Sequence, residues 1–319
     1  MQPKVLIAYP GFGDLTVETQ ILRQIDAEIQ HIGNLTSPEA LAAVKQADAV
    51  MVTLQKVTAD IINSMERCRV ISRAGTGLDT IDVDAATAKG VWVAYVPDYS
   101  IDEVSAHAIA LLMVQARGIV PLVQNTRSGQ WDNMASGPVY RLKGQTLGVV
   151  GFGRIGQATA EKGKGLGLNV IVYDPFLNQA AADRLGVRAV DLETLTRTSD
   201  YISLHTPLIE ETRHIVNAAF LSKMKPTAYL INAARGPLID EQALLDAVRA
   251  KQIAGAALDV LAVEPIAPDS PLLKEERILI TPHAAWYSEE AKIDLRTRCA
   301  EEVVRVLSGQ KPRSPVNQL

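Results

Sequence analysis

Short apolar segments alternate with helical segments along almost the whole of this 319-residue chain, and this alternation restricts the possible folds more than any other feature. Each apolar segment is four to six residues long and is rich in Val, Ile, Leu or Ala. Such runs predict strands buried on both faces, as in parallel sheets. Because a parallel sheet needs helical crossovers, the alternation predicts an α/β fold of doubly wound parallel sheets.

The predicted strands form two series, which indicates two domains. The first series comprises residues 5–9, 49–53, 70–74 and 91–96, and the second comprises 146–150, 169–173, 201–204, 228–232, 255–259 and 278–281. Between them a helix is predicted over 100–119, followed at 121–144 by a Gly-, Asn- and Ser-rich segment with little periodicity. That segment is either an exposed loop or a surface buried against another subunit. A last helix is predicted over 288–307, and periodicity leaves open which domain it joins.

Composition argues against several classes of protein. The net charge is −4 and the basic residues are scattered, so we expect no binding to nucleic acid or to an anionic membrane. The two cysteines, Cys68 and Cys299, lie in no CxxC or Cys/His cluster, so neither a disulfide framework nor a metal site is expected. The N-terminus lacks the pattern of a signal peptide, and no apolar stretch reaches membrane-spanning length, so the expected location is the cytoplasm.

A glycine motif at the start of the second series carries the first chemical signal. Gly151-Phe-Gly-Arg-Ile-Gly156 follows a predicted strand and opens a predicted helix, and Asp174 ends the next strand. Gly151 permits a tight turn, Gly153 lets the backbone approach a pyrophosphate, and Gly156 permits close packing of helix on strand. Asp174 can accept hydrogen bonds from a ribose diol and would repel a 2′-phosphate. A glycine-rich turn without a ligand is the alternative, but the full context favours a dinucleotide site for NAD over NADP.

Three side chains follow later strands of the second series, where open α/β sheets bind their ligands. Arg235, Glu264 and His283 each lie just beyond a predicted strand. Arg235 suits the binding of a keto acid's carboxylate, and His283 suits proton transfer to its carbonyl oxygen. Glu264 suits the second ring nitrogen of that histidine, where it would set the tautomer and stabilise the imidazolium. Each residue alone has an ordinary structural explanation, and only the combination predicts a catalytic set.

Together these motifs resemble the D-isomer-specific 2-hydroxyacid dehydrogenase family. The resemblance is carried by Gly151-Phe-Gly-Arg-Ile-Gly156, Asn232-Ala-Ala-Arg-Gly236, Asp259 with Glu264-Pro265, and Thr281-Pro-His-Ala-Ala-Trp286. It implies an NAD-binding Rossmann domain at residues 99–286, inserted into a flavodoxin-like substrate-binding domain formed by 1–98 and 287–319. It also implies a homodimer that associates through residues 100–143.

The resemblance further assigns roles to individual residues. The family's catalytic arginine, glutamate and histidine fall on Arg235, Glu264 and His283. Its NAD contacts fall on Gly151, Gly153, Arg154, Ile155, Gly156, Asp174, Thr206, Ala233 and Asp259. The backbone turn that binds the substrate carboxylate falls on Gly75, Thr76 and Gly77.

The substrate is less well defined by the sequence. Residues 96–100 and 284–289 are similar to the C-terminal-binding-protein branch of the family, some of whose members respond to NADH as regulators. Trp286 is either a wall of the substrate pocket or a core or interface aromatic. Gln55 is expected to face the substrate, whereas Lys56 either contacts an anionic distal group or is an ordinary surface lysine. We therefore expect reduction of small 2-keto acids such as glyoxylate or hydroxypyruvate, with an NADH-sensing peptide binder or a phosphoglycerate dehydrogenase as alternatives.

Overall fold

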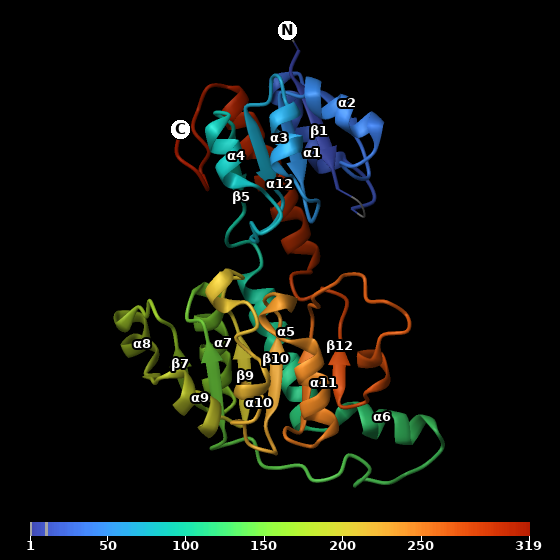
Figure 1. The fold of residues 1–319 in the computed structure, drawn as a ribbon, viewed down its shortest axis with the longest axis vertical. Coiled ribbons are helices and arrows are strands. Elements are labelled where there is room, and N and C mark those ends of the chain that lie inside the picture. The colour runs from blue at the N-terminus through green and yellow to red at the C-terminus, as the bar shows by residue number, and fades with distance from the viewer. Residues whose placement is uncertain (1, 10–11) are drawn as a thin grey trace. The chain divides into compact units, whose positions relative to one another are not determined.

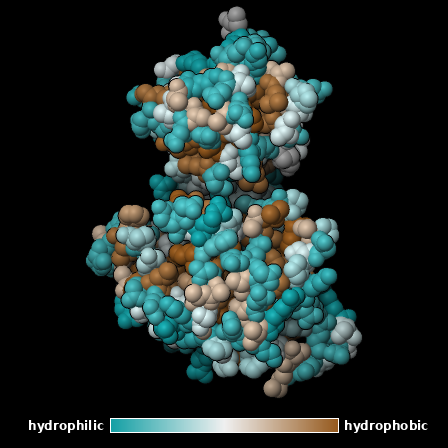
Figure 2. Space-filling view, viewed as in Figure 1, coloured by the Kyte–Doolittle hydropathy of each residue, from teal (hydrophilic) through white to brown (hydrophobic). Residues whose placement is uncertain are grey.

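The chain divides into two compact units in the computed structural model, which describes residues 2–9 and 12–319 (Figure 1). The first unit consists of Met1–Tyr99 together with Ser288–Leu319, and the second is Ser100–Tyr287. Both contain a parallel sheet with helices between the strands, which confirms the predicted α/β fold. On the face shown in Figure 2, hydrophilic side chains predominate and apolar ones are scattered among them, as is usual for a folded surface.

The first unit has a five-stranded parallel sheet in the order β2-β1-β3-β4-β5, which is the flavodoxin-like order. Its strands are β1 (Lys4–Ala8), β2 (Glu28–His31), β3 (Ala49–Val52), β4 (Val70–Arg73) and β5 (Trp92–Tyr95), and its helices are α1 (Thr16–Leu22), α2 (Pro38–Gln46), α3 (Ala59–Ser64), α4 (Val83–Ala88) and α12 (Glu289–Leu307). Strand β2 was not predicted. It lies at the sheet edge, and its residues are mostly exposed, so its sequence lacks an apolar run.

The last helix of the chain, α12, packs on α1 and β4 of this first sheet. Arg296 of α12 is buried and donates two hydrogen bonds to the buried Glu18 of α1, at 2.8 and 2.6 Å. Tyr9 donates a third hydrogen bond to Glu18 at 2.8 Å. A buried ion pair needs such complete hydrogen bonding, because an unpaired charge there would be costly. This contact, which periodicity could not predict, shows that the chain returns to its first sheet.

The second unit has a seven-stranded parallel sheet in the order β12-β11-β10-β9-β6-β7-β8. Its strands are β6 (Thr146–Val150), β7 (Asn169–Tyr173), β8 (Arg188–Ala189), β9 (Tyr201–Leu204), β10 (Tyr229–Asn232), β11 (Gly255–Leu258) and β12 (Ile278–Ile280). Its helices are α5 (Ile101–Ala116), α6 (Ile119–Arg127), α7 (Arg154–Gly165), α8 (Gln179–Leu185), α9 (Leu192–Thr198), α10 (Ala218–Leu221) and α11 (Glu241–Arg249). The strand order is that of a Rossmann sheet with one added strand. Successive strands are added to one side of β6 as far as β8, and to its other side from β9 onward, so the topological switch point lies between β6 and β9.

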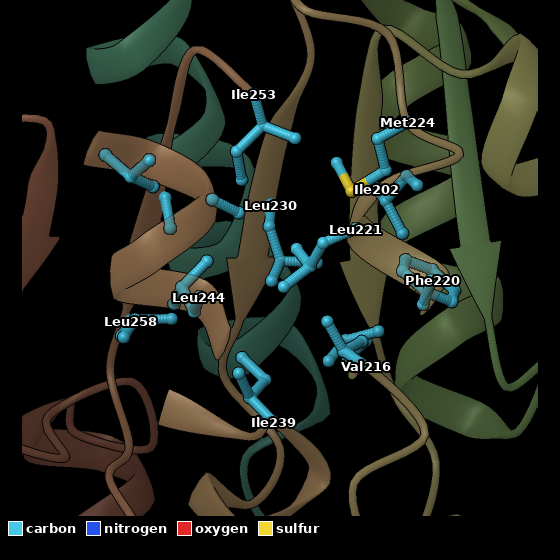
Figure 3. Close-up of a cluster of buried hydrophobic side chains, with 14 of the residues drawn as sticks. Ile202, Val216, Phe220, Leu221, Met224, Leu230, Ile239, Leu244, Ile253 and Leu258 are labelled. Carbon is cyan, nitrogen blue, oxygen red and sulfur yellow. The ribbon is translucent and has the colours of Figure 1, made fainter. Parts of the chain in front are cut away.

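Apolar side chains bury both faces of this second sheet. One cluster joins strand residues such as Ile202 and Leu230 to Leu221 of α10 and Leu244 of α11 (Figure 3). The other cluster includes α5 and α7 side chains. Because both faces are covered, six of the seven strands are largely apolar, which is why they could be predicted from short apolar runs. Strand β8, at the exposed sheet edge, has no such run and was not predicted.

The segment predicted to be irregular at 121–144 begins instead with a helix, so that prediction was wrong for its first residues. Helix α5 ends at Ala116, Gly118 adopts a φ of 56°, and α6 follows as Ile119–Arg127. Pro121 is compatible with α6 because it occupies the first turn, where no backbone N–H has a helical partner. Within the part of the chain that the structure describes, no single helix is long and apolar enough to cross a membrane, although α5 and α6 pass that test together as a pair bent by 61°.

Candidate active site

The glycine turn joins β6 to α7 at the point where the strand order of the second sheet reverses. Gly151 has a φ of 92°, which side chains with a Cβ rarely adopt, and its N–H donates to the carbonyl of Tyr173 at 2.8 Å. A Cβ built on Gly151 would lie 2.6 Å from the carbonyl carbon of His205. The turn therefore passes directly against the loop that follows β9.

The other two glycines of the motif have different surroundings. A Cβ on Gly156 would lie 2.1 Å from the carbonyl oxygen of Gly151, so only glycine permits α7 to start this close to the turn. A Cβ on Gly153 would meet nothing within 4 Å. Gly153 therefore faces open space at the N-terminus of α7, where backbone N–H groups and the helix dipole favour an anion such as a pyrophosphate.

Asp174 follows β7 and lies beside this turn. One of its carboxylate oxygens accepts from the N–H of Phe152 at 2.7 Å, and the other accepts from the N–H of Phe176 at 2.8 Å. The carboxylate is held in place by these bonds and is only partly buried. A carboxylate oxygen can accept more than one hydrogen bond, so Asp174 retains capacity for the hydroxyls of a ribose.

The remaining predicted cofactor residues lie around the same edge of the sheet, and Asp259 is described below with the loop that carries His283. Thr206 follows β9, and a Cβ on Gly151 would lie 2.8 Å from its backbone nitrogen. Ala233 follows β10 and is buried. In the first turn of α7, Arg154 is exposed, whereas Ile155 packs against the core cluster beneath the helix.

Arg235 lies in the loop after β10, and a residue that the sequence analysis missed shapes that loop. The buried Asn232 donates from its amide to the carbonyl of Arg235 at 2.9 Å and accepts from the N–H of Ala234 at 3.0 Å. The guanidinium of Arg235 also donates to the carbonyl of Ala234 at 2.7 Å. Asn232 was visible in the sequence as part of the motif, but its bonds follow from loop geometry that a sequence does not contain.

Glu264 and His283 form a hydrogen-bonded pair. Oε2 of Glu264 lies 2.7 Å from Nδ1 of His283, and both side chains are about one-third exposed, at 30% and 28%. Burial raises the pKa of Glu264, but the bonds from His283 and from the N–H of Leu261 outweigh it and hold this pKa below the ordinary value. An ionised carboxylate only accepts, so Nδ1 of His283 carries the proton and Nε2 is left to exchange a proton with a substrate.

The loops that carry Arg235 and Glu264 pack against each other. A Cβ on Gly236 would lie 1.9 Å from the carbonyl carbon of Leu261, so the two loops are in direct backbone contact. Glu241 of α11 accepts from the N–H of Ala262 at 2.6 Å and ties the second loop to the helix. Since β10, β11 and β12 are neighbouring strands, their ends bring all three predicted catalytic residues to one edge of the sheet.

The backbone of His283 is unusual, with a φ of 53°. Its N–H donates to the carbonyl of Asp259 at 2.8 Å. The buried carboxylate of Asp259 accepts from the hydroxyl of Thr281 at 2.6 Å and from the N–H groups of Ala284 and Ala285, both at 2.9 Å. Asp259 was expected to contact the cofactor, and the structure shows its side chain bonded within the loop that carries His283.

In the first unit, the predicted carboxylate-binding turn follows β4. Arg73, which is buried, donates to the carbonyls of Ala74 at 2.5 Å and Gly77 at 3.0 Å. The hydroxyl of Thr76 donates to the carbonyl of Val96 at 3.2 Å. The turn that includes Gly75 is therefore held by a buried arginine beneath it, a role that the sequence analysis did not anticipate.

Two further predicted substrate contacts have partners of their own. The amide oxygen of Gln55 accepts from the N–H of Thr53 at 2.9 Å and from the hydroxyl of Thr53 at 3.0 Å. Both of these hydrogen bonds lie within the loop that follows β3. Trp286 is half-buried, packs against a core cluster of the second unit and meets Tyr287 edge to face, with ring centroids 5.7 Å apart.

Among residues 2–9 and 12–319, no group of three or more His, Cys, Asp or Glu side chains could hold a metal ion.

More than half of the chain matches the model of a known protein family. Residues 109–285 match the family model described as "D-isomer specific 2-hydroxyacid dehydrogenase, NAD binding domain". The chain belongs to this family. The match confirms the predicted family and NAD as the predicted cofactor, and it covers the glycine turn, Asp174 and the Glu264–His283 pair.

Individual relatives in the family carry different names. A D-3-phosphoglycerate dehydrogenase of Methanocaldococcus jannaschii is 39% identical over 316 residues, which are 98% of this chain but only 59% of that protein. A glyoxylate reductase of Korarchaeum cryptofilum is 39% identical over 86% of this chain and 84% of its own length. The crystal structure of a D-lactate dehydrogenase from Aquifex aeolicus with NAD and lactic acid superposes with a TM-score of 0.88 at 28% identity, over 96% of each chain.

These relatives agree on the family and differ in their named substrates. The chain spans less than two-thirds of the length of the phosphoglycerate dehydrogenase to which it is similar. None of these three relatives is named as a C-terminal-binding protein, so the resemblance to that branch of the family stays a prediction.

Proposed function

We propose that this protein is an NAD(H)-dependent D-2-hydroxyacid dehydrogenase that reduces small 2-keto acids of the glyoxylate or hydroxypyruvate type. The observation that carries the proposal is the 2.7 Å pair of Glu264 and His283 on the sheet edge that also carries Arg235 and the glycine turn. Nicotinamide chemistry needs a proton donor beside the hydride acceptor, and this pair supplies one.

The second unit would hold the cofactor. The turn at Gly151–Gly156 and the N-terminus of α7 would bind the pyrophosphate, and Asp174 would bind the adenosine ribose through its carboxylate. Thr206, Ala233, Arg154 and Ile155 lie around the same site. Because Asp174 carries a negative charge where NADP has its 2′-phosphate, NAD is the preferred cofactor.

The catalytic roles follow from the chemistry of each side chain. When bound in this site, NADH would supply the hydride needed to reduce the keto acid at its 2-carbon. Nε2 of His283 would give its proton to the carbonyl oxygen, so that the 2-keto acid, a hydride and a proton become one 2-hydroxy acid. Glu264 stabilises the protonated ring through Nδ1. Arg235 binds the substrate carboxylate with two parallel hydrogen bonds.

The first unit would complete substrate recognition. We assign substrate binding to residues 1–98 and 287–319 and cofactor binding to 99–286, boundaries that lie within one residue of the observed units. In the first unit, the backbone of Gly75, Thr76 and Gly77 would bind a substrate carboxylate and Gln55 would face the substrate. Trp286, assigned to substrate binding as well, belongs to the second unit.

The choice of a small keto acid rests on the glyoxylate reductase, which is 39% identical and is covered over 84% of its length. A second candidate substrate is a phosphorylated hydroxy acid, because a phosphoglycerate dehydrogenase is 39% identical and because Lys56 is exposed in the loop that carries Gln55. The exposed ammonium of Lys56 would pair with a distal phosphate.

A substrate panel tests the proposal. Glyoxylate, hydroxypyruvate, pyruvate, a branched 2-keto acid and a phosphorylated one are assayed with NADH and with NADPH. We expect the highest kcat/KM with glyoxylate or hydroxypyruvate and NADH, and a loss of at least about 100-fold in kcat for His283→Ala with NADH binding unchanged. Full turnover by His283→Ala would contradict the mechanism, and preference for the phosphorylated acid, lost in Lys56→Ala, would favour the second candidate.

We also infer that the protein is a homodimer associating through residues 100–143. This region exposes an unusual amount of apolar surface, with Trp131 92% and Met134 76% exposed. Light scattering should show a dimer that dissociates in a Trp131→Glu, Met134→Glu double variant. The matched control Leu273→Glu, which changes an exposed apolar residue outside this region, should stay dimeric. A monomeric wild-type protein would refute the inference.

A further inference from the structure

A histidine that no part of the proposed mechanism uses lies against the loop that carries His283. His107 belongs to α5, and its Nε2 lies 3.1 Å from the hydroxyl of Thr281 and 3.4 Å from a carboxylate oxygen of Asp259. The imidazole is separated from these partners by more than 150 positions in sequence but is held beside them by the fold. Helix α5 is firmly placed, because Val104, Ala108 and other side chains of it are buried in the core.

The hydrogen bonds determine which atom carries the proton. The hydroxyl of Thr281 has one proton, and it donates that proton to the carboxylate of Asp259 at 2.6 Å. The hydroxyl oxygen must therefore accept at its contact with His107, so Nε2 of His107 carries an N–H. This N–H points at the hydroxyl and the nearby carboxylate together and adds a donor to a buried anion.

The buried carboxylate of Asp259 organises the loop from Thr281 to Ala285. Burial raises the pKa of Asp259, but the bonds from His107, Thr281, Ala285 and Ala284 outweigh it and hold this pKa below the ordinary value. A buried anion of this kind needs its full set of donors.

The same loop holds His283 in a left-handed backbone conformation, with a φ of 53°, that a residue with a Cβ rarely adopts. Such a conformation persists only where surrounding bonds enforce it. The N–H groups of Ala284 and Ala285, which lie next in sequence, both donate to Asp259. The orientation of the His283 ring toward Glu264 therefore depends on the Asp259 carboxylate and its donors.

We propose that His107 is a positioning residue for the proposed reaction: its Nε2–H, acting through Thr281 and Asp259, keeps the His283 loop in the conformation in which His283 meets Glu264. The proposal rests on the proposed function for its effect on turnover. Its effect on the loop does not depend on the identity of the substrate.

The test compares two substitutions that differ in the donor. His107→Leu removes the N–H and retains an apolar side chain, whereas His107→Gln retains an N–H at a similar distance from the backbone. We expect His107→Leu to lower kcat about tenfold, the equivalent of one hydrogen bond to a charged group. The kcat of His107→Gln should stay within about threefold of the wild-type value, a smaller change than the loss of such a bond would cause.

A control variant separates positioning from general stability. Gln115, also on α5, donates to the carbonyl of Ala256 at 2.7 Å, away from the His283 loop. Gln115→Leu should lower the melting temperature as much as His107→Leu does but leave kcat at the wild-type value. Equal kcat losses in Gln115→Leu and His107→Leu, or equal losses in His107→Leu and His107→Gln, would overturn the proposal.

A second readout does not need turnover. Hydrogen exchange at the amides of Ala284 and Ala285 should become at least tenfold faster in His107→Leu and stay near wild type in His107→Gln and Gln115→Leu. If no 2-keto acid is reduced but this pattern of exchange is observed, the proposed function fails and the positioning role stands. Unchanged exchange in His107→Leu would refute the positioning role.

Discussion

Replacing Gly156 by alanine tests whether the glycine turn is shaped by steric contact. The new methyl carbon would lie 2.1 Å from the carbonyl oxygen of Gly151, so about 1.3 Å of movement is needed to reach an ordinary contact of 3.4 Å. The obstructing atom is backbone, which cannot rotate away as a side chain does. Overpacking of this kind costs about 1–3 kcal/mol. For a domain of this size, we expect the melting temperature to fall by roughly 2–12 °C.

Gly153→Ala is the matched control, because it adds the same methyl group three residues earlier in the motif. Nothing lies within 4 Å of its Cβ, and its φ of −70° suits alanine, so the free protein should keep its stability to within about 0.5 kcal/mol. The methyl group would, however, occupy the space through which a pyrophosphate approaches the N–H groups of α7. Losing a hydrogen bond to a charged group costs about 1.5–3 kcal/mol, so NADH binding should weaken roughly 10- to 100-fold.

The two effects are measured separately. Thermal and urea unfolding of the protein without cofactor give the stability, and titration calorimetry gives the Kd for NADH. The expected pattern is lower stability for Gly156→Ala and weaker binding at unchanged stability for Gly153→Ala. If Gly156→Ala unfolds at the wild-type temperature, the close approach at Gly151 is not rigid. If Gly153→Ala binds NADH like wild type, the cofactor does not use this turn.

Other predictions concern charge and protonation. Glu264→Gln removes the charge that stabilises the His283 imidazolium, so steady-state assays should show kcat falling roughly 10- to 100-fold with KM for NADH unchanged; an unaltered kcat would contradict this role. Asp174→Asn removes the charge and keeps an acceptor oxygen for one of the two N–H groups that the carboxylate binds. The ratio of kcat/KM with NADPH to that with NADH should rise about tenfold or more, as expected for removal of one unfavourable charge interaction; no rise would mean that Asp174 does not select against the 2′-phosphate. Burial lowers the pKa of His205 from 6.5 to about 4, so between these values the unfolded chain binds more protons than the folded one and stability must fall as the pH is lowered from 6.5 toward 4. In urea unfolding, the free energy of unfolding should fall by up to ~1.4 kcal/mol per pH unit in this window because of His205, and this contribution should disappear in His205→Gln. An identical pH dependence in the variant would show that His205 does not cause it.

The sequence predicted the strands well and the exceptions have physical causes. Six of the seven strands of the second sheet are largely apolar because helices cover both faces, so each could be recognised locally. Strand β8, an exposed edge strand of two residues, was not predicted because it has no apolar run. Strand β2 escaped recognition because it is an exposed edge strand, and α6 escaped it because Pro121 and Gly118 resemble loop residues although both are compatible with a helix start. None of these exceptions changed the predicted fold class.

The candidate site could be predicted only in its strongest motifs. Arg235, Glu264 and His283 stood out because each follows a strand and each suits a defined chemical task. The residues that support them, such as Asn232, Glu241 and His107, have no comparable signal. Their partners are loop atoms or distant side chains, and the same residue types occur widely at positions with no such role.

The sequence by itself determined the alternation of strands and helices, the glycine turn and the set of side chains placed after strands. These are local properties, since periodicity and the conformational range of glycine act over a few residues. Tertiary structure alone decided how α12, which the family resemblance had assigned to the first domain, packs on α1 and β4. It also decided that Oε2 of Glu264 lies 2.7 Å from Nδ1 of His283 and that His107 completes the bonds around Asp259. Such contacts depend on the order of strands in a sheet and on how their loops pack, and both are settled by burial and hydrogen bonding between segments far apart in the chain.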